Sequence, residues 1–276
     1  MIPLMIPSPQ GKTRLFAVLG YPVGQVLAPV MMNRLFVESD SDAVMVPIEV
    51  TPENVPAVIA GLKGIANCDG MLVTIPHKFA VCDHADSMST GVRLSGASNA
   101  LRREPDGRWS ADNFDGAGFV AGLRQYGHDP RGKRVSLVGT GGAGVAIASS
   151  LVEAGVSRLS LFDLSADKVQ QLADRLNAHR ADSVEVCAAP KLEDIDIVVN
   201  ATPMGLRDKD PLPFDVSALA DGVVVADIIM KPHDTKLLKA AAARGLAVHH
   251  GIHMLAPQIE MYRKFFRISA AKVKSA

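Results

Sequence analysis

Short runs of apolar and β-branched residues alternate with segments of helical spacing in the first half of the chain. The runs predict strands at Arg14–Leu19, Ala43–Val50 and Asp69–Thr74. The segments between them predict helices at Pro29–Ser39 and Pro52–Leu62. Thr51 fits the N-cap of the second helix, with Pro52 at its first position. Strands that alternate with helices indicate a parallel α/β architecture.

The alternation becomes more regular after the Gly- and Pro-rich segment 126–133. Strands are predicted at Val135–Val138, Leu159–Phe162, Val184–Cys187, Ile195–Asn200 and Val223–Ile228. Helices are predicted at Gly116–Tyr126, Ala143–Ala154, Ala166–Ala178, Thr235–Ala243 and Met254–Ala271. The pattern predicts an α/β protein with two domains. We expect residues 1–113 to form a first α/β domain, residues 114–252 to form a Rossmann-type, doubly wound domain, and residues 253–276 to pack back on the first domain.

Composition and charge exclude several classes of function. The 276 residues are 48% hydrophobic and 21% charged, as in an ordinary folded protein. Lys+Arg and Asp+Glu both number 29, so no net charge favours nucleic acid or an anionic membrane as a partner. Three cysteines without metal spacing indicate reduced thiols, and neither a signal peptide nor a membrane-spanning run is recognisable. We therefore expect a cytoplasmic protein, monomeric or homodimeric, with a small-molecule substrate.

A glycine-rich turn follows the predicted strand Val135–Val138 and opens a predicted helix. It contains Gly139-x-Gly141-x-x-Gly144, with Gly142 and Ala143 between. In this context the first glycine permits a tight turn, the second lets the backbone approach a pyrophosphate, and the third lets helix and strand pack closely. The pattern predicts a dinucleotide site. The alternative is a glycine-rich turn that binds nothing.

Asp163 ends the next predicted strand, 19 residues after Gly144. A carboxylate at this offset accepts hydrogen bonds from the adenosine ribose and repels a 2′-phosphate. Leu164 and Ser165 follow, so no arginine is present to neutralise such a phosphate. The sequence therefore predicts NAD as cofactor, with NADP less favoured. The alternative role of Asp163 is to cap the following helix.

Six separated motifs, in order, resemble those of the shikimate dehydrogenase family over nearly the whole chain. They are Leu72-Val73-Thr74-Ile75-Pro76-His77-Lys78, Gly96-Ala97-Ser98-Asn99, Asn113-Phe114-Asp115-Gly116-Ala117-Gly118, Asn200-Ala201-Thr202-Pro203-Met204-Gly205, Asp227 with Pro232 and Thr235, and Gly251 with Met254, Leu255 and Gln258. Leucine replaces the first motif's asparagine and phenylalanine the third motif's threonine. Each motif alone is weak evidence, but six in order are strong.

The resemblance implies reversible oxidation of a ring secondary alcohol, as in shikimate or quinate, with hydride passing to nicotinamide. It also implies that residues 1–113 are the substrate-binding and catalytic domain and that residues 114–252 are the dinucleotide-binding domain. Lys78 and Asp115 would be catalytic, because hydride loss requires the hydroxyl proton to leave as well. The alternative for these two residues is a salt bridge between the domains. Thr74, Asn99 and Gln258 would bind substrate. The cofactor would also contact Asn200, Thr202, Pro203, Met204, Gly251 and Met254.

The chain departs from the family pattern where the substrate carboxylate is bound. Val26 and Ala28 stand in place of two serines, and Met230 stands in place of a tyrosine. Gln25 could restore some hydrogen bonding. We expect these four residues to line the substrate pocket and to disfavour shikimate itself.

Two other functions stay open from the sequence: a nucleotide-binding regulatory protein without turnover, and a dehydrogenase for a different alcohol. The loss of the carboxylate partners favours the first, while the retained Lys78, Asp115, Asn99 and Gln258 disfavour it. His249 and His253 have the i,i+4 separation of metal ligands on a helix, but Gly251 lies between them and disfavours a helix there. We therefore expect no metal site.

Overall fold

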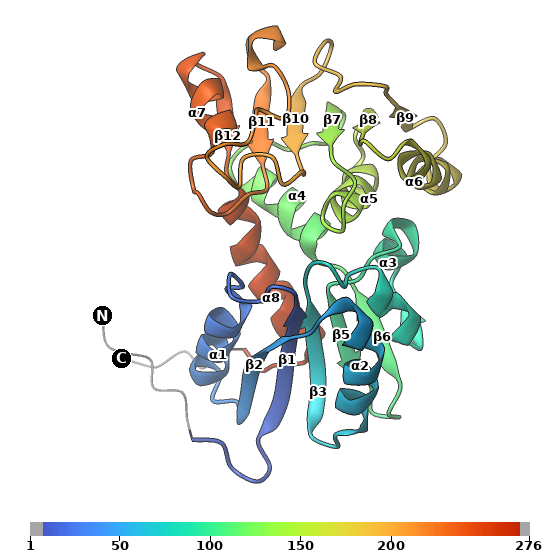
Figure 1. The fold of residues 1–276 in the computed structure, drawn as a ribbon, viewed down its shortest axis with the longest axis vertical. Helices are drawn as coiled ribbons and strands as arrows, with labels where there is room; N and C mark the ends of the chain where they lie inside the picture. Colours follow the sequence, from blue (N-terminus) through green and yellow to red (C-terminus); the bar gives the residue numbers. More distant parts are fainter. Residues whose placement is uncertain (1–7, 271–276) are drawn as a thin grey trace. The chain divides into compact units, whose positions relative to one another are not determined.

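The computed structural model describes residues 8–270, which form two compact units (Figure 1). The first unit contains the described residues up to Phe114 and those from Ile259 onward, and the second contains Asp115–Gln258. Residues 1–7 and 271–276 lie outside the described residues. They include both ends of the predicted first domain and Ala271, the last residue of the last predicted helix.

A six-stranded sheet in the order β2-β1-β3-β5-β6-β4 forms the first unit. Its strands are β1 (Arg14–Gly20), β2 (Ala43–Glu49), β3 (Cys68–Val73), β4 (Ser87–Met88), β5 (Ala100–Arg103) and β6 (Trp109–Asp112). The first three pair in parallel, as the alternation with helices predicts. However, β5 pairs antiparallel with both β3 and β6, so the sheet is mixed and the predicted parallel arrangement holds for β1, β2 and β3.

The antiparallel strands β5 and β6 form a hairpin that the alternation of strands and helices does not predict. Its turn is closed by the Glu104 N–H, which donates to the Arg108 carbonyl at 2.7 Å. Gly107 lies in the left-handed region at φ 84°, which glycine adopts without strain. The Pro105-Asp106-Gly107 sequence is a turn signal that could have revealed the hairpin.

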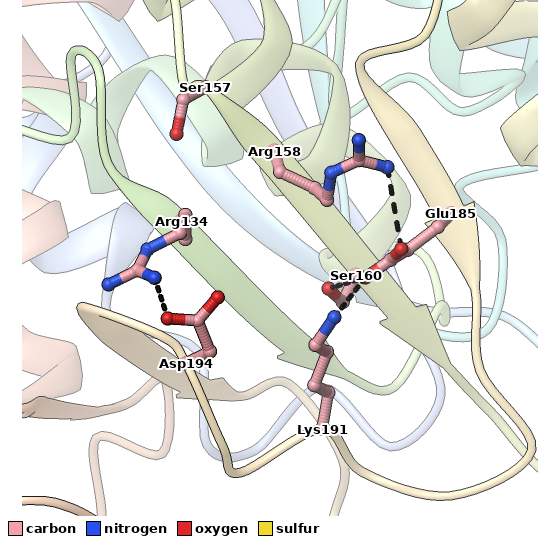
Figure 2. Close-up of a pocket in the computed structure, with 7 residues that line it drawn as sticks. All are labelled: Arg134, Ser157, Arg158, Ser160, Glu185, Lys191 and Asp194. Atoms are coloured by element: carbon pink, nitrogen blue, oxygen red, sulfur yellow. Dashed lines mark hydrogen bonds and ion pairs between the residues drawn. The ribbon is translucent and has the colours of Figure 1, made fainter.

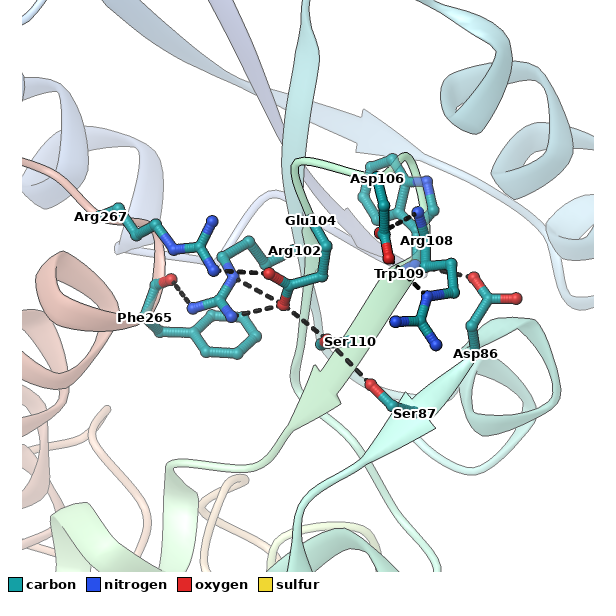
Figure 3. Close-up of polar contacts among 10 residues, drawn as sticks. All are labelled: Asp86, Ser87, Arg102, Glu104, Asp106, Arg108, Trp109, Ser110, Phe265 and Arg267. Atoms are coloured by element: carbon teal, nitrogen blue, oxygen red, sulfur yellow. Dashed lines mark hydrogen bonds and ion pairs between the residues drawn. The ribbon is translucent and has the colours of Figure 1, made fainter.

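Glu104 fastens the start of this turn to the C-terminal segment (Figure 3). Its carboxylate accepts hydrogen bonds from Ser110 at 2.6 Å and from Arg267 at 2.5 Å, and also from the Arg102 guanidinium. Burial alone would raise the pKa of Glu104, but the hydrogen bonds from Ser110, Arg102 and Arg267 outweigh it and lower the pKa to about 2. The hairpin is thus held by an ionised carboxylate at neutral pH.

The first unit's helices are α1 (Ala28–Glu38), α2 (Val55–Gly64), α3 (Thr90–Ser95) and the end of α8 (Leu255–Phe265), with 3₁₀ helices η1 (Pro52–Asn54) and η2 (Ala80–His84). Thr51 is the N-cap of η1, with Pro52 at its first position, as the sequence predicts, although η1 is a 3₁₀ turn and the Thr51 side chain accepts no backbone hydrogen bond there. Its hydroxyl instead accepts from the Asn54 amide at 3.0 Å. Tyr262 and Phe266 belong to the unit's buried apolar core with Phe16 and Phe36.

The second unit is an all-parallel sheet in the order β12-β11-β10-β7-β8-β9. Its strands are β7 (Arg134–Val138), β8 (Arg158–Phe162), β9 (Val184–Val186), β10 (Ile197–Asn200), β11 (Val224–Asp227) and β12 (Ala247–His249). Its helices are α4 (Asp115–Gln125), α5 (Gly144–Ala154), α6 (Ala166–His179), α7 (Lys236–Ala243) and the start of α8, with 3₁₀ helices η3 (Val216–Ala218) and η4 (Gly251–Met254). This order is that of a doubly wound, Rossmann-type domain, as the sequence predicts.

The strand order reverses between β7 and β10, which lie side by side at the centre of the sheet. Ligands of open α/β sheets bind outside the carboxyl ends of the strands at such a reversal. The segments that leave these two ends are the glycine-rich turn after Val138 and the segment after Asn200. Among residues 8–270, no helix has the length and apolar character needed to cross a membrane.

Candidate active site

The predicted site residues lie in both units, and each unit's set is described separately. In the first unit, the segment after β3 carries Thr74 and Lys78. The Thr74 N–H donates to the Leu19 carbonyl at 2.8 Å, which holds this segment beside the end of β1. A Cβ on Gly20 would lie 2.5 Å from Thr74 Cγ2, so the close approach requires a glycine. Lys78 is buried, with 8% of its surface exposed.

Asn99 is buried at the start of β5, and both ends of its amide have partners. Its oxygen accepts from the Phe114 N–H at 3.0 Å, and its nitrogen donates to the Tyr262 hydroxyl at 3.1 Å. Tyr262 is 6% exposed and was not among the predicted site residues. No motif marks it, but it follows Gln258 by four residues on α8, and that spacing is a signal for a shared helix face.

Gln25, Val26 and Ala28, which the sequence assigns to the substrate pocket, have different surroundings in the segment 25–28. Val26 and Ala28 are partly buried and pack against the aromatic core that contains Phe16 and Phe36. Gln25 is exposed, and its amide nitrogen donates to the Pro22 carbonyl at 2.9 Å. The Gln25 amide nitrogen therefore bonds to the backbone of its own loop.

In the second unit, Asp115 and Gln258 are brought together. Asp115 is the first residue of α4, and its Oδ1 accepts a hydrogen bond from the Gln258 amide nitrogen at 3.0 Å. Both side chains are buried, with 6% and 3% of their surfaces exposed. The start of a helix stabilises a carboxylate, because unpaired backbone N–H groups point toward it. Asp115 is thus positioned as an oriented, buried carboxyl group.

Glycines along α4 allow this arrangement. A Cβ on Gly118 would lie 2.5 Å from Gln258 Cγ and 2.8 Å from the Met254 carbonyl oxygen. A Cβ on Gly116 would lie 2.0 Å from the Ala146 carbonyl oxygen of α5. The backbone of α4 therefore touches both α5 and the segment that carries Gln258, with no room for a side chain at either contact.

The glycine-rich turn has the geometry expected of a dinucleotide cradle. Gly139 has φ 102°, and a Cβ there would lie 2.8 Å from the backbone of Ala201, which follows β10. A Cβ on Gly144 would lie 2.2 Å from the Gly139 carbonyl oxygen, whereas one on Gly141 would meet nothing within 4 Å. The turn is thus tightly packed at Gly139 and Gly144 and open at Gly141. The N-terminus of α5 has no side-chain cap.

Asp163 follows β8 and points its carboxylate at the same turn. Its Oδ2 accepts from the Thr140 N–H at 2.6 Å and from the Thr140 hydroxyl at 3.1 Å, while its Oδ1 accepts from the Ser165 N–H at 3.1 Å. Burial tends to raise the pKa of Asp163, but these hydrogen bonds outweigh it and hold the pKa below its ordinary value. Leu164 beside it is 95% exposed.

Three predicted cofactor contacts bond chiefly to one another. The Asn200 side-chain oxygen accepts from the Thr202 N–H at 3.1 Å and from the Thr202 hydroxyl at 2.7 Å. The Asn200 amide nitrogen donates to the Met204 carbonyl at 3.1 Å and to Asp227 Oδ1 at 3.2 Å. Asn200 is fully buried and shapes the turn on which Thr202, Pro203 and Met204 are presented.

Asp227 anchors the loop that carries Met230. Its carboxylate accepts hydrogen bonds from the Thr235 hydroxyl at 2.8 Å and from the Ile229 N–H at 3.0 Å. Burial raises the pKa of Asp227 although these hydrogen bonds oppose the shift. Thr235 also caps α7, so one buried carboxylate fixes both ends of the loop 228–234. Met230 lies partly buried within this loop.

The histidines that the sequence singled out do not lie on an α-helix. The segment between them contains the 3₁₀ helix η4, and the Nδ1 atoms of His249 and His253 lie 3.3 Å apart. Burial, followed by the neighbouring histidines, lowers the pKa of His249 to about 3. Gly251 and Met254 are both buried in this segment.

The family model described as the shikimate dehydrogenase substrate binding domain matches residues 18–101, and that described as shikimate / quinate 5-dehydrogenase matches residues 123–205. A shikimate dehydrogenase (NADP(+)) of Rubrobacter xylanophilus is 37% identical over 257 residues, which cover 91% of this chain and 90% of that protein. The chain belongs to the shikimate dehydrogenase family. The resemblance inferred from the six motifs is confirmed.

Solved structures of relatives of the shikimate dehydrogenase family extend this comparison. Quinate dehydrogenase from Corynebacterium glutamicum, in complex with NAD, is 29% identical, covers 94% of this chain and 95% of its own, and has a TM-score of 0.84. The 5-ketofructose reductase of a Gluconobacter strain is 28% identical, with coverage of 94% and 95% and a TM-score of 0.83. The chain is thus an NAD(P)-dependent oxidoreductase that acts on a CH–OH group, with the two-domain α/β fold of its family.

Two surface cavities lie away from this chemistry. The larger, of about 430 Å³, lies beside the starts of β7 and β8 and is drawn in Figure 2. Its basic side chains are paired: Arg134 with Asp194, and Arg158 and Lys191 with Glu185. Ligands of such sheets bind at the carboxyl ends of the strands, whereas this cavity lies at their amino-terminal ends. A second, of about 290 Å³, lies beside the Glu104 network of Figure 3.

The glycine contacts of α4 generate a prediction. Gly118→Ala should lower the free energy of unfolding by about 1–3 kcal/mol, because its methyl group overlaps Gln258 and Met254. Gly61→Ala is the matched control, since Gly61 lies within α2 and a Cβ there meets nothing within 4 Å. That variant should gain up to about 1 kcal/mol from helix propensity. Urea titration of both proteins measures the difference; equal stabilities would contradict the packing described.

Proposed function

We propose that the protein catalyses reversible hydride transfer between a secondary alcohol of a polyhydroxylated, cyclic substrate and a nicotinamide cofactor, with NAD preferred. The observation that carries this proposal is the combination of retained and altered residues. Lys78, Asn99, Asp115 and Gln258 are all buried, and hydrogen bonds orient the last three, while Val26, Ala28 and Met230 are apolar. A binding protein without turnover has no need of a buried lysine and an oriented carboxylate.

Lys78 and Asp115 are the proposed catalytic residues. Oxidation of an alcohol requires its hydroxyl proton to leave with the hydride, so a positioned acid–base group lowers the barrier. In the proposal the neutral Lys78 amino group takes the hydroxyl proton as the hydride leaves, and the resulting ammonium returns that proton to the oxygen in the reverse reaction. The Asp115 carboxylate stabilises the ammonium form. Gln258 holds that carboxylate in one orientation through the 3.0 Å hydrogen bond.

The glycine-rich turn fits a dinucleotide. A Cβ on Gly141 would meet nothing within 4 Å, so a ligand can approach the backbone there, and the α5 N-terminus favours negative charge. When bound there, the nicotinamide accepts or returns the hydride. Thr202, Pro203 and Met204, presented by Asn200 at the neighbouring strand end, are proposed to contact it, as are Gly251 and Met254.

The preference for NAD is proposed from Asp163. Hydrogen bonds from Thr140 and Ser165 lower the pKa of its carboxyl, so the group is ionised at neutral pH. An ionised carboxylate accepts from ribose hydroxyls and repels a 2′-phosphate, and the exposed Leu164 offers no positive charge to offset the repulsion. The Rubrobacter relative is named for NADP(+) and the Corynebacterium structure contains NAD, so both cofactors occur among relatives.

The substrate is proposed to have no carboxylate at the place where shikimate's carboxylate would meet Val26, Ala28 and Met230. A hydrogen bond to a charged group contributes roughly 1.5–3 kcal/mol, so losing three partners costs about 4 kcal/mol or more, roughly a thousandfold in affinity. Val26 and Ala28 offer only apolar surface there, and Gln25 is tied to Pro22. The Gluconobacter relative is named for 5-ketofructose, a substrate that has no carboxylate. A neutral polyol or keto-sugar fits these residues better than an acid.

The first prediction from the proposed function concerns catalysis. Lys78→Ala should lower kcat by about 10²–10⁴-fold, the usual effect of a lost acid–base group, and leave NAD affinity nearly unchanged. Lys78→Met, which keeps the apolar stem, should behave alike. Lys168→Ala, on the exposed face of α6, is the matched control and should keep full activity. Turnover and fluorescence titration of NAD measure both quantities. Near-normal turnover of both Lys78 variants would assign the proton transfer to another residue.

A second prediction concerns the cofactor. The unmodified protein should bind NAD more tightly than NADP, and Asp163→Ser with Leu164→Arg should shift the preference toward NADP. Leu164→Ser alone is the control, because it adds no charge and Leu164 is almost fully exposed. Fluorescence titrations with both cofactors decide the point. Equal or tighter binding of NADP by the unmodified protein would refute the role given to Asp163.

A third prediction concerns specificity. A screen of cyclic hydroxy acids, neutral polyols and keto-sugars should show low kcat/KM for shikimate and quinate and higher values for a neutral compound. Val26→Ser, Ala28→Ser and Met230→Tyr together should raise kcat/KM for shikimate chiefly by lowering KM, and by more than the single changes combined. Val30→Ser, at a 72% exposed position in the same segment, is the control. A micromolar KM for shikimate in the unmodified protein would contradict the proposed pocket.

A further inference from the structure

A group of potential metal ligands gathers in the second unit, outside the residues assigned to the reaction. His233 and Asp234 lie in the loop between β11 and α7, and His250 follows β12 directly. His233 Nδ1 lies 3.2 Å, and His250 Nε2 3.0 Å, from the same oxygen, Oδ1 of Asp234. One ligand atom from each residue lies within 4.8 Å of the other two. The strands β11 and β12 are parallel, so both segments leave the same edge of the sheet.

The backbone holds the two segments against each other. A Cβ on Gly251 would lie 2.4 Å from the Ile228 carbonyl oxygen and 2.7 Å from that of Ile229. The loop 228–234 therefore lies directly on the residue after His250. Its two ends are fixed by the buried hydrogen bond between Thr235 and Asp227. The three ligands are thus supported by rigid neighbours although the His233 and Asp234 side chains are exposed.

Fold stability does not account for this cluster. The side chains of His233 and Asp234 are 58% and 57% exposed, and exposed ion pairs contribute at most about 1 kcal/mol. The His233 and His250 rings are stacked with centroids 4.3 Å apart, so protonating both would bring two like charges together. However, one carboxylate oxygen close to two imidazole nitrogens is an arrangement that can bind a metal ion.

We propose that His233, Asp234 and His250 bind one divalent transition-metal ion of the Zn²⁺ or Ni²⁺ type. In a tetrahedral zinc site with metal–ligand distances of about 2.0–2.1 Å, neighbouring ligand atoms lie roughly 3.3 Å apart. The two distances to Asp234 Oδ1 are close to that value. Two imidazoles and one carboxylate favour such ions over Mg²⁺ or Ca²⁺, which prefer oxygen ligands.

The nearby histidines are engaged elsewhere. The His253 ring is stacked on Tyr126 with centroids 3.6 Å apart, and its Nδ1 faces that of His249. His249 is 1% exposed. The bound ion therefore keeps open coordination positions for water. Because it joins the loop 228–234 to the end of β12, it stiffens the loop that carries Met230, and this consequence does not depend on the identity of the substrate.

The test is metal binding by the full-length protein without any histidine tag. Isothermal titration with Zn²⁺, and absorption spectroscopy with Co²⁺ as a probe of coordination geometry, should give one equivalent per chain, reversed by EDTA. His233→Ala, Asp234→Asn and His250→Ala should each weaken binding at least about tenfold, since even supporting residues of metal sites have effects of that size. His179→Ala, an exposed histidine at the end of α6, is the matched control and should bind as the unmodified protein does.

Thermal unfolding provides an independent readout. Zn²⁺ should raise the Tm of the unmodified protein and of His179→Ala, and not that of the three ligand variants, because a ligand stabilises only the state that binds it. In EDTA all five proteins should unfold at similar temperatures, which shows that the variants are folded. Saturation by Mg²⁺ with equal affinity, or Zn²⁺ binding that survives His233→Ala and is lost only in His253→Ala, would overturn the proposal.

Discussion

The second unit depends on the absence of side chains along α4. At Gly116, Gly118 and Gly122 the helix backbone lies so close to its neighbours that a single methyl group would overlap backbone atoms of Ala146, Met254 and His253 respectively. These contacts fix α4 against α5, which starts at the glycine-rich turn, and against the segment that leads into α8. Asp115 and Gln258 can share a hydrogen bond only because both are carried by elements held at this distance. The carboxylate's orientation is thus set by backbone packing.

Several motif residues hold loops in shape and are themselves hidden. Asn200, Asp227 and Thr235 are all completely buried and hydrogen-bond to one another or to adjacent backbone. A buried polar group without partners would be costly, so such residues tolerate little change once the loop depends on them. Their effect on a ligand is indirect, because they determine where Thr202, Met204 and Met230 stand. Replacing them would alter the fold of the strand ends before it altered any chemistry.

Sequence reasoning was most successful where a short local pattern specifies a structure. The glycine-rich turn, the carboxylate at Asp163 and the all-parallel sheet follow from spacing and strand order, and the structure contains them. It failed where a contact joins segments that are far apart in the sequence. Tyr262 meets Asn99 across 163 residues, and nothing near either residue indicates the contact. The β5–β6 hairpin had a local signal in Pro105-Asp106-Gly107 that the expectation of parallel strands obscured. The grouping of His233 and Asp234 with His250 depends on the pairing of β11 with β12. The strand β12 is only three residues long and is difficult to predict from the sequence.

The surroundings of Val26, Ala28 and Leu164 have a consequence for how such a protein can diverge. Leu164 is 95% exposed, so a substitution there has almost no effect on folding. Val26 and Ala28, in contrast, pack against the aromatic core of the first unit. A hydroxyl introduced at either position meets apolar surface and weakens that packing. In the proposed function, cofactor choice can therefore drift under mutation with little effect on stability, whereas substrate choice is coupled to stability and changes only with compensating substitutions in the core.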